Sequence, residues 1–198
     1  SRVVIHVDGP RVVRLNMPPD PHRSTTTDHI AGRGGEFLDV RWSEDSAQIA
    51  FVSSSRDHKE ARLRMADAET GAVRDVMEEV SDTYFESGDG FSNWHYLSEY
   101  NEVIWFSERD NWGHLYLVDL ATGQIKNRIT QGKWAVQQVR HIDRKNRKIY
   151  FTAGGRDGSD PYFIHYYSVK MDGSGLNLLT PEDAHHAVTF SPDYRFFV

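Results

Sequence analysis

The adjacent carboxylates Glu78 and Glu79 are the residues whose type and spacing most readily suggest chemistry in this sequence. Two carboxylates can hold one cation, such as an ammonium group, through charge-assisted hydrogen bonds. Glutamate is rarely buried without a partner, however, and this pair lies at the end of an expected strand, before a polar segment. We therefore favour a solvated pair, with the cation site as its alternative.

A serine nucleophile would need a sharp, strained turn, as in the Gly-x-Ser-x-Gly elbow that exposes the serine between a strand and a helix. The nearest match, Asp172-Gly173-Ser174-Gly175, lacks this spacing and lies in an expected hairpin turn. We expect no catalytic residue within these 198 residues.

Metal chemistry has equally little support among the ten histidines. His185 and His186 are adjacent, so in a strand they point to opposite faces. There is no His-Glu-x-x-His motif, and the absence of cysteine excludes disulfides and thiolate metal sites. We expect no metal and no cofactor, and we expect His114, after Trp112-Gly113, to order the start of a strand.

The elements that would position these residues are strands. Short runs of alternating apolar residues, bounded by turn residues, recur along the chain and are typical of strands. They cover 2–7, 12–17, 37–43, 48–54, 102–108, 114–120, 137–143, 148–153, 164–171 and 187–191. The best helical candidate, 60–80, is divided into two strand-like halves by the turn Glu69-Thr70-Gly71.

The strands repeat as a unit. Segments 41–57, 95–110 and 140–157 align with one another, and each ends on an Arg-Asp pair. Each is followed by a second hairpin, with the turns Thr70-Gly71, Thr122-Gly123 and Asp172-Gly173. We interpret the repeated pairs, Arg56-Asp57, Arg109-Asp110 and Arg156-Asp157, as surface turn anchors rather than catalytic groups.

Four strands in about 50 residues is the size of a β-propeller blade. The sequence therefore predicts an all-β fold, a partial β-propeller of roughly three and a half to four blades of four antiparallel strands. The expected division is an earlier blade's end plus a loop (1–36), three blades (37–80, 81–131 and 132–183), and the start of a truncated blade (184–198).

Composition excludes several classes of protein. Hydrophobic residues make up 38% and charged residues 26%, so we expect a packed core rather than disorder. A net charge of −6 disfavours nucleic acid as a partner, and no apolar run reaches the ~18–20 residues of a membrane span. The chain opens without Met and closes on an apolar run, so we expect a piece of a longer protein.

Three segments carry a family resemblance: SERDNWGHLYL (107–117), ITQGKWAVQQV (129–139) and IYFTA (149–153). DGSGLNLLTPE (172–182) and HHAVTFSPDYRFFV (185–198) add to it. Together they resemble the N-terminal propeller of the dipeptidyl peptidase IV family, in the prolyl oligopeptidase clan of serine peptidases. The likeness runs from about Phe37 to Val198 and is loose before it.

The resemblance implies that an α/β-hydrolase domain, with the catalytic Ser, Asp and His, follows the propeller in the parent protein. That protein would remove dipeptides, typically after Pro or Ala, from free peptide N-termini. The propeller would restrict access to the cavity and supply a Glu pair for the substrate's α-ammonium. In the family that pair lies on a helical insertion of an earlier blade, so Glu78-Glu79 does not correspond to it.

The segment 85–94 joins two expected blades and is rich in Gly and aromatic residues. In the family the corresponding stretch approaches the peptide cavity. The resemblance therefore implies that an extended substrate site is lined by Phe85, Glu86, Phe91 and Trp94. We favour the alternative that the aromatic rings serve packing between blades.

Two functions remain open: the accessory propeller segment of a serine exopeptidase, and a stand-alone propeller that binds proteins or glycans as a scaffold. The expected partners of the first are peptide substrates and the hydrolase domain of the same chain. Open blade edges also favour self-association of an isolated fragment. The family's bacterial members are often exported, which suggests the periplasm, although the sequence does not decide the compartment.

Overall fold

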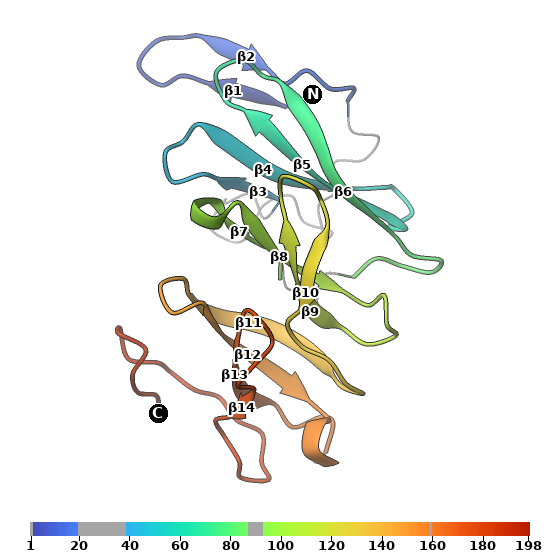
Figure 1. The fold of residues 1–198 in the computed structure, drawn as a ribbon, viewed down its shortest axis with the longest axis vertical. Helices are drawn as coiled ribbons and strands as arrows, with labels where there is room; N and C mark the ends of the chain where they lie inside the picture. The colour runs from blue at the N-terminus through green and yellow to red at the C-terminus, as the bar shows by residue number, and fades with distance from the viewer. Residues whose placement is uncertain (1, 20–38, 87–92, 159) are drawn as a thin grey trace.

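The computed structural model describes residues 2–19, 39–86, 93–158 and 160–198, and these form fourteen strands and two short 3-10 helices (Figure 1). The strands make four antiparallel sheets, and no α-helix occurs among the described residues. The sheets follow one another in chain order from the N-terminal hairpin at the top of Figure 1 to the C-terminal segment at the bottom.

The first sheet is a hairpin of β1 (Val3–Ile5) and β2 (Val12–Arg14). The second, here called blade A, contains β3 (Val40–Trp42), β4 (Gln48–Ser54), β5 (Glu60–Asp67) and β6 (Val73–Val80). Each strand pairs with the next one along the chain, in the order β3-β4-β5-β6.

The next two sheets repeat this order. Blade B contains β7 (His95–Leu97), β8 (Glu102–Ser107), β9 (His114–Asp119) and β10 (Ile125–Arg128). Blade C contains β11 (Ala135–Asp143), β12 (Lys148–Gly154), β13 (His165–Lys170) and β14 (Asn177–Leu178). The 3-10 helices cover Ser98–Tyr100 and Arg156–Gly158.

A single antiparallel bridge, Phe190 to Phe197, follows blade C. Successive four-stranded meanders stacked face to face are the layout of a propeller, so the predicted all-β partial β-propeller is confirmed. The helical candidate 60–80 is the hairpin of β5 and β6.

Three hydrophobic layers lie between the four sheets. Phe51 and Leu15 belong to the layer between the hairpin and blade A. The layer between blades A and B, called joint A/B, contains Leu63, Trp94 and Trp105, and the layer between blades B and C, called joint B/C, contains Trp134 and other large side chains. Alternation along each strand places one set of side chains in each layer, so blades A and B each bury both of their faces.

The turn between the third and fourth strands touches the preceding sheet. In blade A, Thr70 donates from its backbone N–H (2.7 Å) and its hydroxyl (2.7 Å) to Asp67, and Gly71 follows at φ +73°. In blade B the same turn ends on Gly123 at φ +71°. A Cβ at either glycine would lie under 3.0 Å from a carbonyl oxygen of the preceding sheet, that of Arg14 or of Val76.

Candidate functional site

The candidate site is a cavity of about 450 Å³ where the end of blade A meets blade B. One wall is the end of β6 and the segment that follows it, and the other is the turn between β8 and β9. The lining residues are Glu79, Val80, Ser81, Asp82, Thr83, Tyr84, Phe85, Glu86, Glu108, Arg109 and Asn111.

Glu79 anchors the floor of this cavity. It lies near the end of β6, is 9% exposed, and crosses joint A/B to blade B. Its carboxylate accepts from the Trp105 indole N–H (2.6 Å), from the Ser107 hydroxyl and from the Arg109 guanidinium (2.9 Å). A buried carboxylate needs such charge-assisted partners, and here blade B supplies all three.

The prediction that Glu78 and Glu79 form a solvated pair is wrong for Glu79. Adjacent residues of a strand point to opposite faces, so β6 turns Glu78 outward and Glu79 toward blade B. Glu78 stays partly exposed and pairs with Arg62 at 2.6 Å. The same geometry prevents the two carboxylates from holding one cation together.

Arg109 completes the anchor from the turn after β8. Its Nε donates to the Ser107 hydroxyl oxygen (2.9 Å) while its Nη2 reaches Glu79, and its guanidinium lies over the Tyr116 ring at 5.0 Å. Its neighbour Asp110 accepts from Tyr116 and pairs with Arg128 at 2.7 Å. In blade B, therefore, the repeated Arg-Asp pair ties the turn to two strands and the preceding blade.

Negative charge dominates the cavity. Among the described residues that line it, four carry carboxylates and one, Arg109, carries a guanidinium. Partial desolvation in the cavity, followed by the charges of Glu86 and Glu79, raises the pKa of Glu108 above its ordinary value. Like charges that share a cavity disfavour one another's ionised form, and a cationic group entering the cavity would relieve that repulsion.

Two of the four residues predicted for a substrate site lie in this cavity. Phe85 is 5% exposed, lines the cavity and stacks on Trp105 with ring centroids 5.8 Å apart. Glu86 also lines it. Trp94 is 1% exposed within joint A/B, with the Arg41 guanidinium 5.2 Å from its ring, and Phe91 lies outside the described residues.

Sequence reasoning did not assign Glu108 or Arg109 to the site. A signal was present in the repeat. The residue before the repeated arginine is small in the first and third copies, Ser55 and Gly155, but is Glu108 in the middle copy. Glu79 could have been separated from Glu78 by strand alternation alone.

The remaining sequence candidates lie elsewhere. Ser174 sits in the turn between β13 and β14, where its backbone N–H donates to Asp172 at 2.8 Å. Among the described residues, no group of three or more His, Asp or Glu side chains is placed to hold a metal ion. In the same part of the chain, no helix has the length and apolar character needed to cross a membrane.

Comparison with known proteins agrees with this architecture. The family model described as "Dipeptidyl peptidase IV (DPP IV) N-terminal region" matches residues 2–198. A dipeptidyl peptidase 4 of Trichophyton equinum is 26% identical over 168 residues, which cover 76% of this chain and 21% of that protein. A probable dipeptidyl-aminopeptidase B of Trichophyton verrucosum is 41% identical over 66 residues, covering 32% of this chain and 7% of the relative.

Solved structures show the same fold. Porphyromonas gingivalis dipeptidyl peptidase 4 matches with a TM-score of 0.72 and 16% identity, over 96% of this chain and 24% of that one. A putative dipeptidyl aminopeptidase IV from Bacteroides ovatus matches with a TM-score of 0.63 and 20% identity, over 85% of this chain and 26% of that one. The first-named fungal relative is matched over 21% of its length, so this chain spans about a fifth of such a protein. The resemblance found in the sequence is thus confirmed, and the chain belongs to the dipeptidyl peptidase IV N-terminal region family.

Proposed function

We propose that this chain is the non-catalytic propeller segment of a dipeptidyl peptidase IV-like serine exopeptidase. It gates and helps to bind peptide substrates, whose N-terminal Xaa-Pro or Xaa-Ala dipeptide is cleaved by an α/β-hydrolase domain of the same polypeptide. The observation that carries the proposal is the acidic cavity at joint A/B, in a chain of this family.

The cavity has a suitable size and charge for part of a peptide. Its volume of about 450 Å³ lies within the ~300–1,000 Å³ of ordinary ligand pockets. Its aromatic wall, Phe85, would contact apolar parts of the peptide, and Glu86 and Glu108 would attract basic groups. A peptide chain that continues beyond the cleaved dipeptide would therefore bind better here when it carries lysine than when it carries glutamine.

Glu79 and Arg109 have a different role in this proposal. Their charges are already matched across joint A/B, so they position the cavity walls instead of binding substrate directly. Glu86 and Glu108, which lie on the two opposite walls, carry the proposed contacts.

The test uses the full-length protein and measures kcat/KM for three substrates. These are a chromogenic Xaa-Pro dipeptide, a longer peptide with the same Xaa-Pro followed by lysines, and its glutamine counterpart. The double variant Glu86→Gln, Glu108→Gln should lower kcat/KM about tenfold for the lysine peptide, a change of ~1.4 kcal/mol, and leave the dipeptide substrate unchanged.

Glu78→Gln is the matched control, because Glu78 is on the same strand but pairs with Arg62 away from the cavity. The assignment of the cavity fails if the double variant changes all three substrates equally, or if the lysine and glutamine peptides react alike in the unmodified protein. An N-blocked dipeptide substrate separates the proposed activity from endopeptidase cleavage, because only the free N-terminus should be accepted.

A stand-alone propeller that binds proteins or glycans is the second candidate. If the full-length protein cleaves neither the free nor the blocked dipeptide, this reading takes first place. Self-association of the isolated chain through its end sheets stays a prediction; exposed apolar side chains on the N-terminal hairpin, Ile5 at 61% and Val12 at 56%, favour it.

A further inference from the structure

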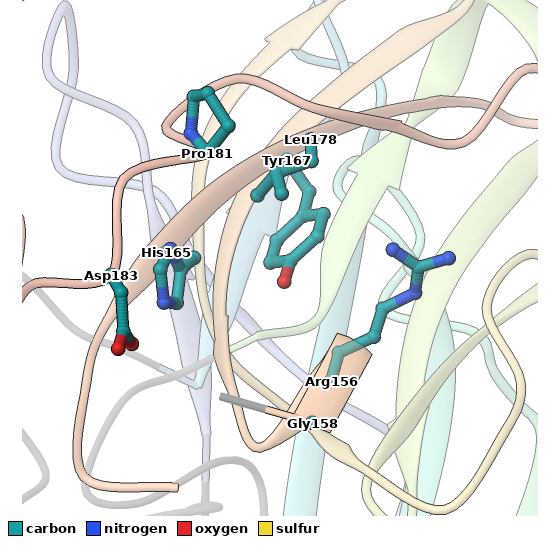
Figure 2. Close-up of a pocket in the computed structure, with 7 residues that line it drawn as sticks. All are labelled: Arg156, Gly158, His165, Tyr167, Leu178, Pro181 and Asp183. Carbon is teal, nitrogen blue, oxygen red and sulfur yellow. The ribbon is translucent and has the colours of Figure 1, made fainter. Parts of the chain in front are cut away.

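Blade C contains a second pocket, of about 250 Å³, remote in sequence from the acidic cavity. Figure 2 shows its lining, with Asp183, His165, Tyr167 and Arg156 in succession across the view. Gly158, Leu178 and Pro181 complete the lining. The volume is below the ~300–1,000 Å³ of drug-sized ligand sites, so the pocket fits a ligand of amino-acid size.

His165 gives the pocket an unusual acceptor. The residue is 3% exposed, and its Nδ1 lies 2.8 Å from the carbonyl oxygen of Thr180. A carbonyl can only accept, so Nδ1 carries the proton and the Nε2 of the neutral ring is a bare lone pair. That Nε2 is buried and has no hydrogen-bond partner among the described residues. A buried acceptor without a donor costs free energy, which a ligand N–H would recover.

His114 occupies the same position in blade B and shows how the site could have been closed. Its Nε2 donates to the carbonyl oxygen of Gly132 (3.0 Å), and its Nδ1 meets the Thr130 hydroxyl (3.1 Å). Gly132, two residues after Thr130, thus supplies the carbonyl oxygen that pairs with the second ring nitrogen of His114. Hydrogen bonding therefore assigns opposite tautomers to the two histidines.

In blade C the corresponding carbonyl pairs with a different histidine. Glu182 follows Thr180 by two residues, and its carbonyl oxygen accepts from His186 Nε2 at 2.9 Å. The ring of His165 lies beside that of His186, with centroids 5.2 Å apart, and its own Nε2 is left without the closing partner. In blade C, therefore, His186 takes the carbonyl that corresponds to the partner of His114 Nε2 in blade B, and His165 Nε2 stays unpaired within the described part of the chain.

The charged groups of the pocket lie apart from one another. Figure 2 shows the Asp183 carboxylate beside the His165 ring and the Arg156 guanidinium beyond the Tyr167 ring. The guanidinium lies 5.5 Å from the centre of the Tyr167 ring and 6.0 Å from that of Trp134, so aromatic faces hold it in place. One end of the pocket is suited to an ammonium group and the other to a carboxylate.

We propose that this pocket binds a small zwitterion, a free α-amino acid with an apolar side chain. The ammonium group would donate to His165 Nε2 and to Asp183, and the carboxylate would accept from Arg156. The side chain would lie on Leu178 and Pro181. The proposal uses none of the residues of the acidic cavity and is independent of the peptidase function proposed above.

The experiment is isothermal titration of L-leucine into the full-length protein. The expected result is saturable binding, with N-acetyl-L-leucine and L-leucinamide binding at least tenfold more weakly, because each lacks one of the two charges. Absence of saturable binding overturns the proposal. Equal binding of N-acetyl-L-leucine also overturns it, since that result describes an anion site at Arg156 alone.

Three single variants should each weaken L-leucine binding at least tenfold: His165→Asn, Asp183→Asn and Arg156→Gln. His165→Asn retains an amide N–H for the Thr180 carbonyl while removing the lone pair. Asp183 is exposed, so its variant tests the pocket without a buried change. His185→Asn, an exposed neighbour outside the lining, is the matched control and should bind normally.

Leucine bound in the peptide cavity would respond differently. Its affinity would fall with Glu86→Gln and Glu108→Gln and would be unchanged in Asp183→Asn, a pattern that overturns the assignment to blade C. Cleavage of dipeptide substrates without saturable leucine binding shows that the blade C proposal alone has failed. Saturable leucine binding without cleavage shows that the peptidase proposal alone has failed.

Discussion

Joint A/B and joint B/C bury the two faces of the same four-stranded sheet, yet they are closed by different interactions. At the β8–β9 end of joint A/B, a buried carboxylate, Glu79, gathers three donors from blade B beside a hollow acidic cavity. In joint B/C, the Trp134 ring stacks on Phe151 at 6.1 Å and on Tyr167 at 6.2 Å. Joint B/C also has a buried carboxylate, Glu102 at 3% exposed, which pairs with Arg147 of blade C at 2.7 Å and with Lys126 of its own blade. The contrast between the joints therefore lies in the aromatic stack around Trp134 and in the open cavity beside Glu79.

The difference shows that a repeated fold can change its interactions at each joint. Aromatic stacking fills space, and its cost when disturbed scales with the volume removed. A buried charge with fixed donors instead depends on one protonation state and on exact pairing, so that even an isosteric change is costly. A joint of the second kind can leave space open beside it, because the hydrogen bonds hold the walls.

The largest expected effect is in joint B/C. Trp134→Ala should lower the free energy of unfolding by about 4 kcal/mol, since removing a buried indole leaves a cavity between two blades. Chemical denaturation followed by circular dichroism measures it. Trp134→Phe should recover more than half of the loss if packing is what matters, and an equal loss in both variants would contradict the comparison.

Glu79→Gln should cost about 3 kcal/mol although it conserves shape, because the amide meets donors from Ser107, Trp105 and Arg109 with too few acceptors. Unfolding by chemical denaturation, monitored by intrinsic tryptophan fluorescence, is the readout. The matched change Glu78→Gln should cost less than ~0.5 kcal/mol, because that ion pair is exposed. Similar losses for both variants would remove the distinction between the two joints.

His114→Leu and His165→Leu compare the two related histidines within blades B and C. The first leaves the Gly132 carbonyl unpaired and removes one of the two partners of the Thr130 hydroxyl, which keeps the Leu115 N–H, and should cost about 2 kcal/mol. The second breaks one bond and also removes an unpaired nitrogen, so about 1 kcal/mol or less is expected. Differential scanning calorimetry under identical conditions ranks the two variants by stability. The reverse order would show that His165 Nε2 has a hydrogen-bond partner in solution.

The smallest effect concerns pH and belongs to joint A/B. Because the pKa of Glu108 is raised in the folded chain, the folded state holds this proton more tightly than the unfolded state does. The associated stabilisation is present below the ordinary value of 4.5 and is lost as the pH rises through the folded value. Glu108 is exposed, so Glu108→Gln should change stability by less than ~0.5 kcal/mol at pH 7, in the stabilising direction. Denaturation curves at pH 4 and pH 7 test the sign, and a destabilising effect at pH 7 would contradict it.

Much of the fold was predictable because blade structure is local. Strand alternation indicates each hairpin, the Thr-Gly turns of blades A and B and the Asp-Gly turn of blade C mark the second hairpin of each blade, and the repeated segments revealed the propeller. The cavity was not predictable, because it depends on contacts between two blades. The Glu79 side chain holds the cavity wall only where blade B places Trp105 and Ser107 beside it. Phe85 and Glu86 were proposed from the family resemblance, and their role in substrate binding stays a prediction. The unpaired nitrogen of His165 could not be predicted, because it depends on which histidine ring reaches the Glu182 carbonyl.

The glycine turns determine how far apart neighbouring blades stand. Gly71 and Gly123 lie so close to the backbone of the preceding sheet that a single methyl group would push two blades apart. In a closed ring the angles between successive blades must add up to one full turn. A change in the angle at one glycine turn must therefore be compensated by the angles at the other joints. The number of blades that closes such a ring therefore depends on glycine at these two positions. A Gly→Ala substitution at either one is enough to begin a change in that number.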